Sequence, residues 1–358
     1  AKAEPQISTW PDWRGAARDG RVKQLPATLP ATPRIVWRRP LGSPGLGGVS
    51  ATMRHVFVTQ RELNDTTDVF CCLDAATGEE VWRHAHPAIG QLDYGNSPRA
   101  TPIVSGDSVY LQGAHGTIHC VDAATGELRW QFDMWSEFDV APTPKWGACA
   151  TPLLVDGKLI INPGAKLVSL AALDAKTGAI IWRTAGEEAG YGSFIVATLG
   201  GKRQIVGHDT NSLGGWDVAT GKRLWRLAPP KPGDFNVPTP IVVGQELIVL
   251  TENNGTRRFR FDDQGKVIAR PVATYDDLKP DTQSAVVSGS RLIGAGAGLH
   301  CLDLKQGLES VWVADEAEFH VHTSLIADDR RVLALTLHGG LMLIDSQSDN
   351  PRVLGRMQ

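Results

Sequence analysis

Short stretches of alternating apolar and polar residues run along most of the chain, and turns rich in Gly and Asp separate them. One well-marked unit contains four such stretches, at 99–104, 108–112, 116–121 and 127–131. Alternation over about five residues, bounded by such turns, is typical of β-strands, and no stretch carries a convincing helical period. The pattern therefore predicts an all-β chain built from four-stranded units.

The unit is repeated along the chain. The turn sequence Asp-Ala-Ala-Thr-Gly at 74–78 recurs unchanged at 122–126, in close variants at 174–178 and 217–221, and in weaker copies that begin at Asp262, Asp303 and Asp345. The repeat Asp residues are 41 to 52 residues apart, which is the range of propeller blades. A Trp follows four of them by eight positions, namely Trp82, Trp130, Trp182 and Trp225, and Trp312 follows Asp303 by nine. We expect each Trp to pack between neighbouring sheets.

Seven units predict a seven-bladed β-propeller of four-stranded antiparallel blades. An eight-bladed ring stays open if the two chain ends build a partial blade. Residues 1–33 are expected to form an N-terminal extension that packs on the ring, and residues 34–358 a single propeller. The segment 34–41 carries Trp37 without a preceding turn, so we expect it to be a strand beside 352–356 that closes the ring on the last blade.

The repeat also carries a family resemblance. Residues 172–182 read Ala-Leu-Asp-Ala-Lys-Thr-Gly-Ala-Ile-Ile-Trp, which resembles the repeat of the PQQ-like β-propellers, and the resemblance extends over roughly residues 34–356. The stretches at 10–20 and 94–102 resemble single-propeller members that bacteria secrete or keep in the periplasm. The resemblance implies architecture and a periplasmic or secreted location, and a polar N-terminus without an apolar core is expected of a mature chain. It leaves the chemistry open.

The charge balance and the hydropathy of the chain limit the classes of partner that it can have. The chain of 358 residues has 36 Lys and Arg against 39 Asp and Glu, a balance that argues against nucleic acid as a partner. No run of 18 apolar residues predicts a membrane span, and we expect a monomer.

Five Cys is an odd number, so at least one thiol is unpaired or pairs with another molecule. Cys72, Cys120 and Cys301 each lie two residues before a repeat Asp, a position that favours a small core side chain, and the state of Cys71 and Cys72 stays open.

In a propeller, the connections that enter the innermost strands and the hairpins between second and third strands share one face around the axial funnel. Loops at that mouth are the expected ligand site. The candidate catalytic residues there are Tyr94, Arg99, Tyr191, His320 and His322. The candidate ligand-binding residues are Asn96, His115, Trp146, His208, Asn236, Gln283 and His338.

Three kinds of chemistry fit this set. The His residues at the mouth suit a divalent metal, and the pair His320 and His322 can point to one face of a strand. His, Tyr and Arg99 suit acid–base chemistry on an acidic sugar, with the guanidinium holding a carboxylate. Trp146, Tyr94 and Asn96 would suffice for a binding mouth without catalysis.

The family name also suggests PQQ, which the residues argue against. Quinoprotein dehydrogenases have a Ca²⁺ site of Glu, Asn and Asp, a catalytic Asp and a Trp below the quinone, and this set has no match here. Cys71-Cys72 resembles their vicinal disulfide in sequence only, because the repeat register places Cys72 at a core position. The sequence therefore assigns no cofactor and argues against PQQ, and a divalent metal at the His residues of the mouth stays open.

The leading hypothesis is an extracytoplasmic ligand-binding or scaffold module whose funnel mouth takes a carbohydrate or a protein segment. The alternative is a carbohydrate-active enzyme, a polysaccharide lyase or a glycoside hydrolase. A PQQ-dependent dehydrogenase is third. A ligand at the mouth is expected to contact Arg99 together with His320 or His322.

Overall fold

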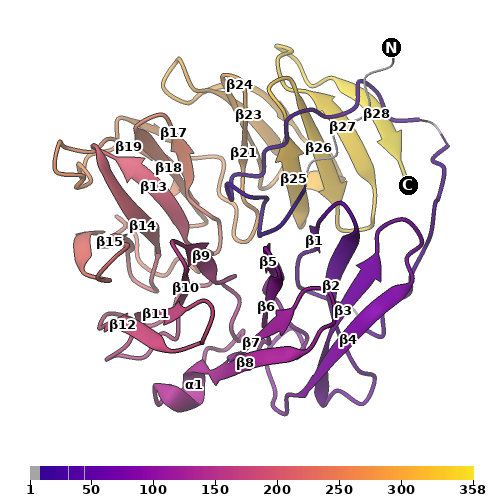
Figure 1. Cartoon of the computed structure of the whole chain (residues 1–358). Helices are drawn as coiled ribbons and strands as arrows, with labels where there is room; N and C mark the ends of the chain where they lie inside the picture. The colour runs from indigo at the N-terminus through magenta and orange to yellow at the C-terminus, as the bar shows by residue number, and fades with distance from the viewer. Residues whose placement is uncertain (1–8, 31, 44) are drawn as a thin grey trace. The chain divides into compact units, whose positions relative to one another are not determined.

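The computed structural model describes residues 9–30, 32–43 and 45–358. Within them the strands form seven four-stranded sheets, and in each sheet consecutive strands are antiparallel neighbours (Figure 1). The predicted seven four-stranded units are therefore confirmed, and these residues contain no eighth sheet.

The chain divides into two compact units, each described here by itself. Unit 1 comprises the residues up to Arg18, Ile35–Ala165 and Ala172–Ile181, and unit 2 comprises Asp19–Arg34, Lys166–Ala171 and Trp182–Gln358. The first two sheets belong to unit 1 and the last four to unit 2, while the third sheet has residues in both.

The first sheet has β1 (Ser50–Ala51), β2 (His55–Arg61), β3 (Thr67–Asp74) and β4 (Glu80–Pro87). The second has β5 (Ile103–Ser105), β6 (Ser108–Gln112), β7 (Thr117–Asp122) and β8 (Leu128–Asp133), and the short helix α1 (Met134–Glu137) follows it. The third has β9 (Leu153–Val155), β10 (Lys158–Ile161), β11 (Leu170–Asp174) and β12 (Ile180–Thr184).

The fourth sheet has β13 (Ile195–Leu199), β14 (Lys202–His208), β15 (Leu213–Asp217) and β16 (Arg223–Leu227). The fifth has β17 (Ile241–Val243), β18 (Glu246–Thr251), β19 (Gly255–Phe259) and β20 (Ala273–Tyr275). The sixth has β21 (Val286–Ser288), β22 (Arg291–Ala295), β23 (Leu299–Asp303) and β24 (Glu309–Ala314), followed by the 3-10 helix η1 (Ala317–Phe319). The seventh has β25 (Thr323–Ala327), β26 (Arg331–Thr336), β27 (Leu341–Asp345) and β28 (Val353–Met357).

The repeated turn joins the third and fourth strands of a sheet. In the first sheet the Asp74 carboxylate accepts hydrogen bonds from the backbone N–H groups of Ala76 and Thr77, both at 2.9 Å. Gly78 closes the turn at a φ of 73°, in the left-handed region that costs Gly little. The same bonds recur in the turns at Asp122, Asp174 and Asp217. The repeated sequence therefore forms the same hydrogen-bonded turn in four sheets.

Three of the repeat Trp residues pack on the turn of the following sheet. The Trp82 indole N–H donates to the Ala123 carbonyl at 3.0 Å, and its ring covers Gly126 so closely that a Cβ there would be 2.7 Å away. Trp130 and Trp182 make the same contacts one sheet further along. Packing between neighbouring sheets is thus confirmed for these residues.

The expected strand at 34–41 is wrong. This segment has no regular secondary structure, and the last sheet consists of β25 to β28 alone. The Trp37 indole instead donates to the Ala75 carbonyl at 3.0 Å and lies over Gly78. Trp37 therefore contacts a repeat turn as the repeat Trp residues do, but without a strand ladder.

The N-terminal extension contacts the sheets of each unit. In unit 1, Trp10 pairs with Ala51, and the buried Arg18 donates to the Thr151 carbonyl at 3.2 Å. In unit 2, Arg21 forms a parallel bridge with Ala327. Part of the segment assigned to this extension, residues 1–8 and 31, lies outside the described residues.

All five cysteines are free thiols. Cys72, Cys120 and Cys301 are almost completely buried, as their position before the repeat Asp predicts. Among the described residues, no helix is long and apolar enough to span a bilayer.

Candidate functional site

A buried arginine links the loops at one end of the first two sheets in unit 1. Arg61, at the end of β2, donates from Nη1 to Asp68 Oδ1 at 2.7 Å and from Nε to the Asp65 carboxylate. Its Nη2 also donates to the carbonyls of Asp65 at 2.7 Å and Ala88 at 2.6 Å. One guanidinium therefore joins the β2–β3 hairpin to the start of the β4–β5 connection.

Asn96 strengthens this link. Its side-chain amide donates to Asp65 Oδ2 at 2.8 Å and accepts the Leu92 backbone N–H at 2.9 Å. The hairpin 62–66 and the connection 88–102 are consequently held together by side chains that the fold buries. We call this pair of segments the tied loops.

The Arg99 side chain donates to backbone carbonyls of its own loop. Its Nη1 donates to the Ser97 carbonyl at 3.0 Å, and its Nη2 donates to the carbonyls of Asp93 and Gly95, both at 2.7 Å. The sequence predicts that this guanidinium holds a carboxylate of a ligand, and this stays a prediction. Both Nη atoms donate to backbone carbonyls of the connection.

The tied loops present large apolar side chains to solvent. Tyr94 is 81% exposed and is held at a left-handed φ of 64°, with its ring centroid 6.3 Å from that of Trp146. Leu63 and Ile89, on the same two loops, are 88% and 82% exposed. Large exposed apolar side chains that gather in one patch are a feature of interaction surfaces.

Titratable groups beneath these loops are shifted toward their neutral forms. Burial raises the pKa of Asp68 to about 6, although Arg61 opposes the shift. Burial, with the Arg61 and Arg99 charges, lowers the pKa of the His115 imidazole. Burial raises the pKa of the Cys149 thiol, which donates to the Trp146 carbonyl at 3.1 Å, to about 12. A protonated thiol is a poor nucleophile, so Cys149 is not suited to covalent catalysis.

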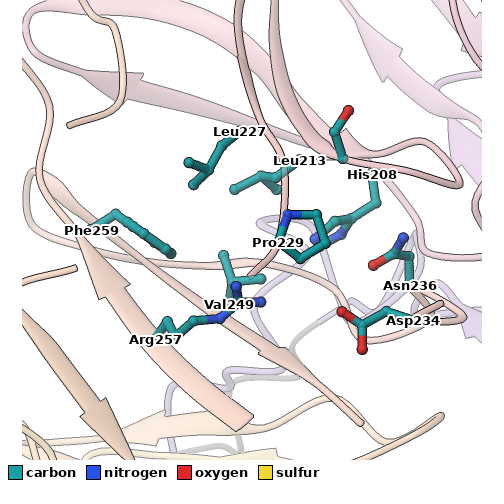
Figure 2. A pocket seen from close by; sticks show the side chains of 10 residues that line it. His208, Leu213, Leu227, Pro229, Asp234, Asn236, Val249, Arg257 and Phe259 are labelled. Atoms are coloured by element: carbon teal, nitrogen blue, oxygen red, sulfur yellow. The ribbon is translucent and has the colours of Figure 1, made fainter. Parts of the chain in front are cut away.

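In unit 2, His208 and Asn236 line a small pocket between the fourth and fifth sheets (Figure 2). Figure 2 shows their side chains beside those of Asp234 and Arg257, with Leu213, Val249 and Phe259 on the apolar side. Asn236 donates to the carbonyls of Asp209 at 3.0 Å and Thr210 at 3.1 Å. Burial and the Arg257 charge lower the pKa of His208 to about 3, so the imidazole is neutral.

The cavity volume is about 10 Å³. This is about the smallest space that holds one water molecule, and it cannot admit a sugar or a peptide. The sequence predicts that His208 and Asn236 bind a ligand at the funnel mouth, and this stays a prediction. Both side chains are buried where the fifth sheet packs against the fourth.

The other candidates in unit 2 point to separate neighbours. The Gln283 amide donates to the Val321 carbonyl at 3.1 Å, and His322 Nδ1 lies 2.9 Å from the Thr282 hydroxyl. His320 Nε2 lies 2.5 Å from Asp315 Oδ1. Tyr191 lies half-buried before β13.

His338 lines a hollow of about 550 Å³ on the last sheet, together with Glu318 and Arg356. Within the described parts of the chain, no three His, Cys, Asp or Glu side chains are placed to hold a metal ion.

Sequence reasoning missed a cluster of three histidines between β4 and β7. The ring centroids of His84 and His86 lie 4.8 Å and 4.5 Å from that of His119. His119 is almost completely buried, both of its ring nitrogens lack a hydrogen bond among the described residues, and burial lowers its pKa to about 3. The available signal was the alternation Trp82-x-His84-x-His86, which places Trp82, His84 and His86 on one face of β4.

The PQQ-like family model described as outer membrane protein assembly factor BamB matches residues 18–170, 88–314 and 166–353. These matches together cover most of the chain. The chain belongs to this family of PQQ-like repeat β-propellers.

Its relatives include both assembly factors and dehydrogenases. The outer membrane protein assembly factor BamB of Burkholderia pseudomallei is 27% identical over 232 residues, which are 61% of this chain and 57% of that protein. The quinohemoprotein alcohol dehydrogenase ADH-IIG of Pseudomonas putida is 29% identical over 175 residues, 45% of this chain. The match spans only 23% of that enzyme's length.

Solved structures agree on the fold. BamB from Moraxella catarrhalis has a TM-score of 0.57 at 21% identity, with 82% of this chain and 83% of that chain covered. The dehydrogenase ADHIIG of Pseudomonas putida has a TM-score of 0.60 at 11% identity, with 98% of this chain and 72% of that chain covered. The seven sheets are therefore the blades of a β-propeller.

Cys71 and Cys72 bear on the resemblance to quinoproteins. Cys71 and Cys72 are separate thiols within β3, where Cys72 packs with Phe57, Phe70 and Trp82, so they do not offer a disulfide surface to a quinone. The donor set that would hold the Ca²⁺ ion of a quinoprotein is also not assembled among these residues.

Proposed function

We propose that this chain is an extracytoplasmic scaffold module that binds a protein segment on the tied loops of unit 1. The observation that carries the proposal is the exposure of Leu63, Ile89 and Tyr94 on loops fixed by the buried Arg61. Aromatic side chains such as Tyr are enriched among the few residues that provide most of the affinity at protein interfaces. Loops that are already ordered lose less conformational entropy when a partner binds.

The family supports a protein partner and a location outside the cytoplasm. The name of the Burkholderia relative states a role in the assembly of outer membrane proteins. A module of that kind would work in the periplasm and contact other extracytoplasmic proteins. A segment of such a protein is the partner that the proposal expects.

Site-specific photo-crosslinking tests the proposal in cells that export the full chain. A photoreactive phenylalanine analogue at Tyr94 or Ile89 is expected to give discrete adducts with a protein. Matched controls at Leu128 and Val81, which are exposed apolar positions on outer strands of unit 1, are expected to give none. Equal adducts at all four positions, or none at Tyr94 and Ile89, would overturn the proposal.

A companion titration addresses the carbohydrate that the sequence left open. The ring pair Tyr94 and Trp146 is also suited to stacking on a sugar. Calorimetry with neutral and acidic oligosaccharides is expected to show no saturable heat. Saturable heat that is lost in Tyr94→Ala would assign the surface to carbohydrate instead.

A further inference from the structure

A hollow on unit 2 is lined mainly by cations. It has a volume of about 380 Å³, and its lining residues are Lys202, Asp217, Thr220, Lys222, Arg223, Leu224 and Lys266. It lies at the repeat turns of the fourth and fifth sheets, away from the buried cavity at His208. We call it the basic hollow.

The segments around the basic hollow are fixed in place. Gln204 is fully buried, and its amide donates to the Gly265 carbonyl at 2.9 Å and to the Lys202 carbonyl at 3.4 Å. Its side-chain oxygen accepts the Trp225 indole N–H at 2.6 Å. The backbones that carry Lys202 and Lys266 are therefore joined by one side chain.

The acidic groups near the hollow already have partners. The Asp217 carboxylate accepts the N–H groups of Ala219 and Thr220 and the Thr220 hydroxyl within its own turn, at 2.8 to 3.1 Å. Asp262 Oδ1 accepts the backbone N–H groups of Gln264 and Lys266.

The cations differ in their pairing. Arg223 is paired with the buried Asp209 at 2.9 Å and lies over the Trp216 ring, so its charge is balanced. The ammonium groups of Lys202, Lys222 and Lys266 form no ion pair within the described part of the chain. These exposed lysines are therefore available to an anion.

The repeat shows that the fold does not require this charge. The residue that follows the turn Gly is Glu79 in the first sheet, Glu127 in the second and Ala179 in the third. In the fourth and fifth sheets the same position is Lys222 and Lys266. Since the turn forms with either sign of charge, the basic residues point to a ligand and not to turn geometry.

We propose that the basic hollow binds a phosphate group, carried by a small phosphomonoester or by a lipid headgroup. Ammonium groups form short, charge-assisted hydrogen bonds with phosphate oxygens. The volume of about 380 Å³ lies in the range of small-molecule sites and leaves room for a polar group beside the phosphate.

The two sources are separated by two titrations at low salt. One uses glycerol 1-phosphate and inorganic phosphate in calorimetry, and the other measures sedimentation with vesicles of phosphatidylglycerol or of phosphatidylcholine. Saturable binding to either phosphate source identifies that source. Vesicle binding is expected to require the anionic lipid.

Charge-reversal variants assign the binding to the hollow. Lys222→Glu and Lys266→Glu are each expected to weaken binding by roughly tenfold or more, the usual effect of losing a hydrogen bond to a charged group. The matched control is Lys176→Glu, an exposed lysine in the equivalent turn of the third sheet. Circular dichroism should confirm that all three variants fold.

The proposal is overturned if neither phosphate source binds. It is also overturned if Lys176→Glu weakens binding as much as Lys222→Glu, because the effect would then be one of overall charge. These outcomes are independent of crosslinking at the tied loops, which lie in unit 1.

Discussion

Arg61 in unit 1 and Arg257 in unit 2 are both buried, but their guanidinium groups differ in their partners. Arg61 in unit 1 is 2% exposed and forms ion pairs with Asp65 and Asp68. Arg257 in unit 2 is 7% exposed and forms no ion pair among the described residues, where its Nη2 donates to the Thr251 hydroxyl at 3.2 Å. Its Nε has no partner there, and the residue lines the small pocket beside His208 (Figure 2).

The difference favours one region over the other as the proposed interaction surface. A paired guanidinium that also binds two backbone carbonyls fixes the loops around it, so apolar side chains on those loops have defined positions. An unpaired guanidinium at a cavity is costly to bury and organises no surface loop. This difference favours the proposed protein-binding surface at Arg61 over one at Arg257.

The comparison is tested most strongly by removing each arginine. Arg61→Ala leaves Asp68 buried without its partner, so we expect a loss of about 3–5 kcal/mol in the free energy of unfolding. Arg257→Met replaces an unpaired buried charge by an apolar chain, and we expect a change within about 1 kcal/mol, or a gain. Urea denaturation of both variants measures the difference. Equal losses would show that pairing does not distinguish the two residues.

A second test concerns the packing that supports unit 1. Trp130 is buried against the turn at Gly178, and Trp130→Ala is expected to cost about 3–5 kcal/mol, as for other large buried aromatics. Trp130→Phe keeps most of the apolar contact but removes the 3.1 Å bond to Ala175, for a smaller loss of about 1 kcal/mol. Chemical denaturation distinguishes the two variants. A loss below about 1 kcal/mol for the Ala variant would place the side chain outside the core.

A third test uses pH. The folded-state pKa of His119, about 3, lies below its ordinary value of 6.5, so the folded chain binds fewer protons than the unfolded chain. The contribution of neutral His119 to the free energy of unfolding is therefore fully present above pH 6.5 and is lost as the pH falls from 6.5 toward 3. We expect His119→Leu to reduce the fall in unfolding free energy between pH 7 and pH 5. His208 in unit 2 has the same shift, so an unchanged slope would leave His208 as the main contributor.

The smallest expected effect is local. Arg99→Ala removes three hydrogen bonds to the β4–β5 connection, which is at the surface. We expect faster amide hydrogen exchange over 88–99 and a change in global stability of about 1 kcal/mol. If exchange in that segment is unchanged, Arg99 does not shape the loop, and the role in binding an anion regains support.

Local sequence predicted the features that depend on neighbouring residues in the chain. The Asp74 turn, the positive φ of Gly78 and the burial of Cys72 all follow from positions within one repeat. Trp37 shows the limit of this reasoning. Its contact with a repeat turn could be expected, but the strand that was expected to carry it did not form.

The candidate site depended more on distant contacts. Asn96 was identified from its place in a connection, yet its partner Asp65 lies 31 positions earlier. Arg61 was missed, because a charged residue at the end of a strand has the same sequence pattern whether it meets solvent or two carboxylates. His208 was placed at an open mouth, because no local pattern shows how closely the next sheet will pack.

The sequence by itself determined the repeat, the four strands of each unit and the turns between them, because each of these depends on interactions over a few residues. The tertiary structure decided which polar side chains became structural and which remained accessible. Arg99 turned toward its own loop, His208 was enclosed, and Lys222 remained exposed at a basic hollow. Burial and pairing are set by the packing of segments far apart in the chain, so the chemistry of this propeller is decided between its sheets and loops and not within a single repeat.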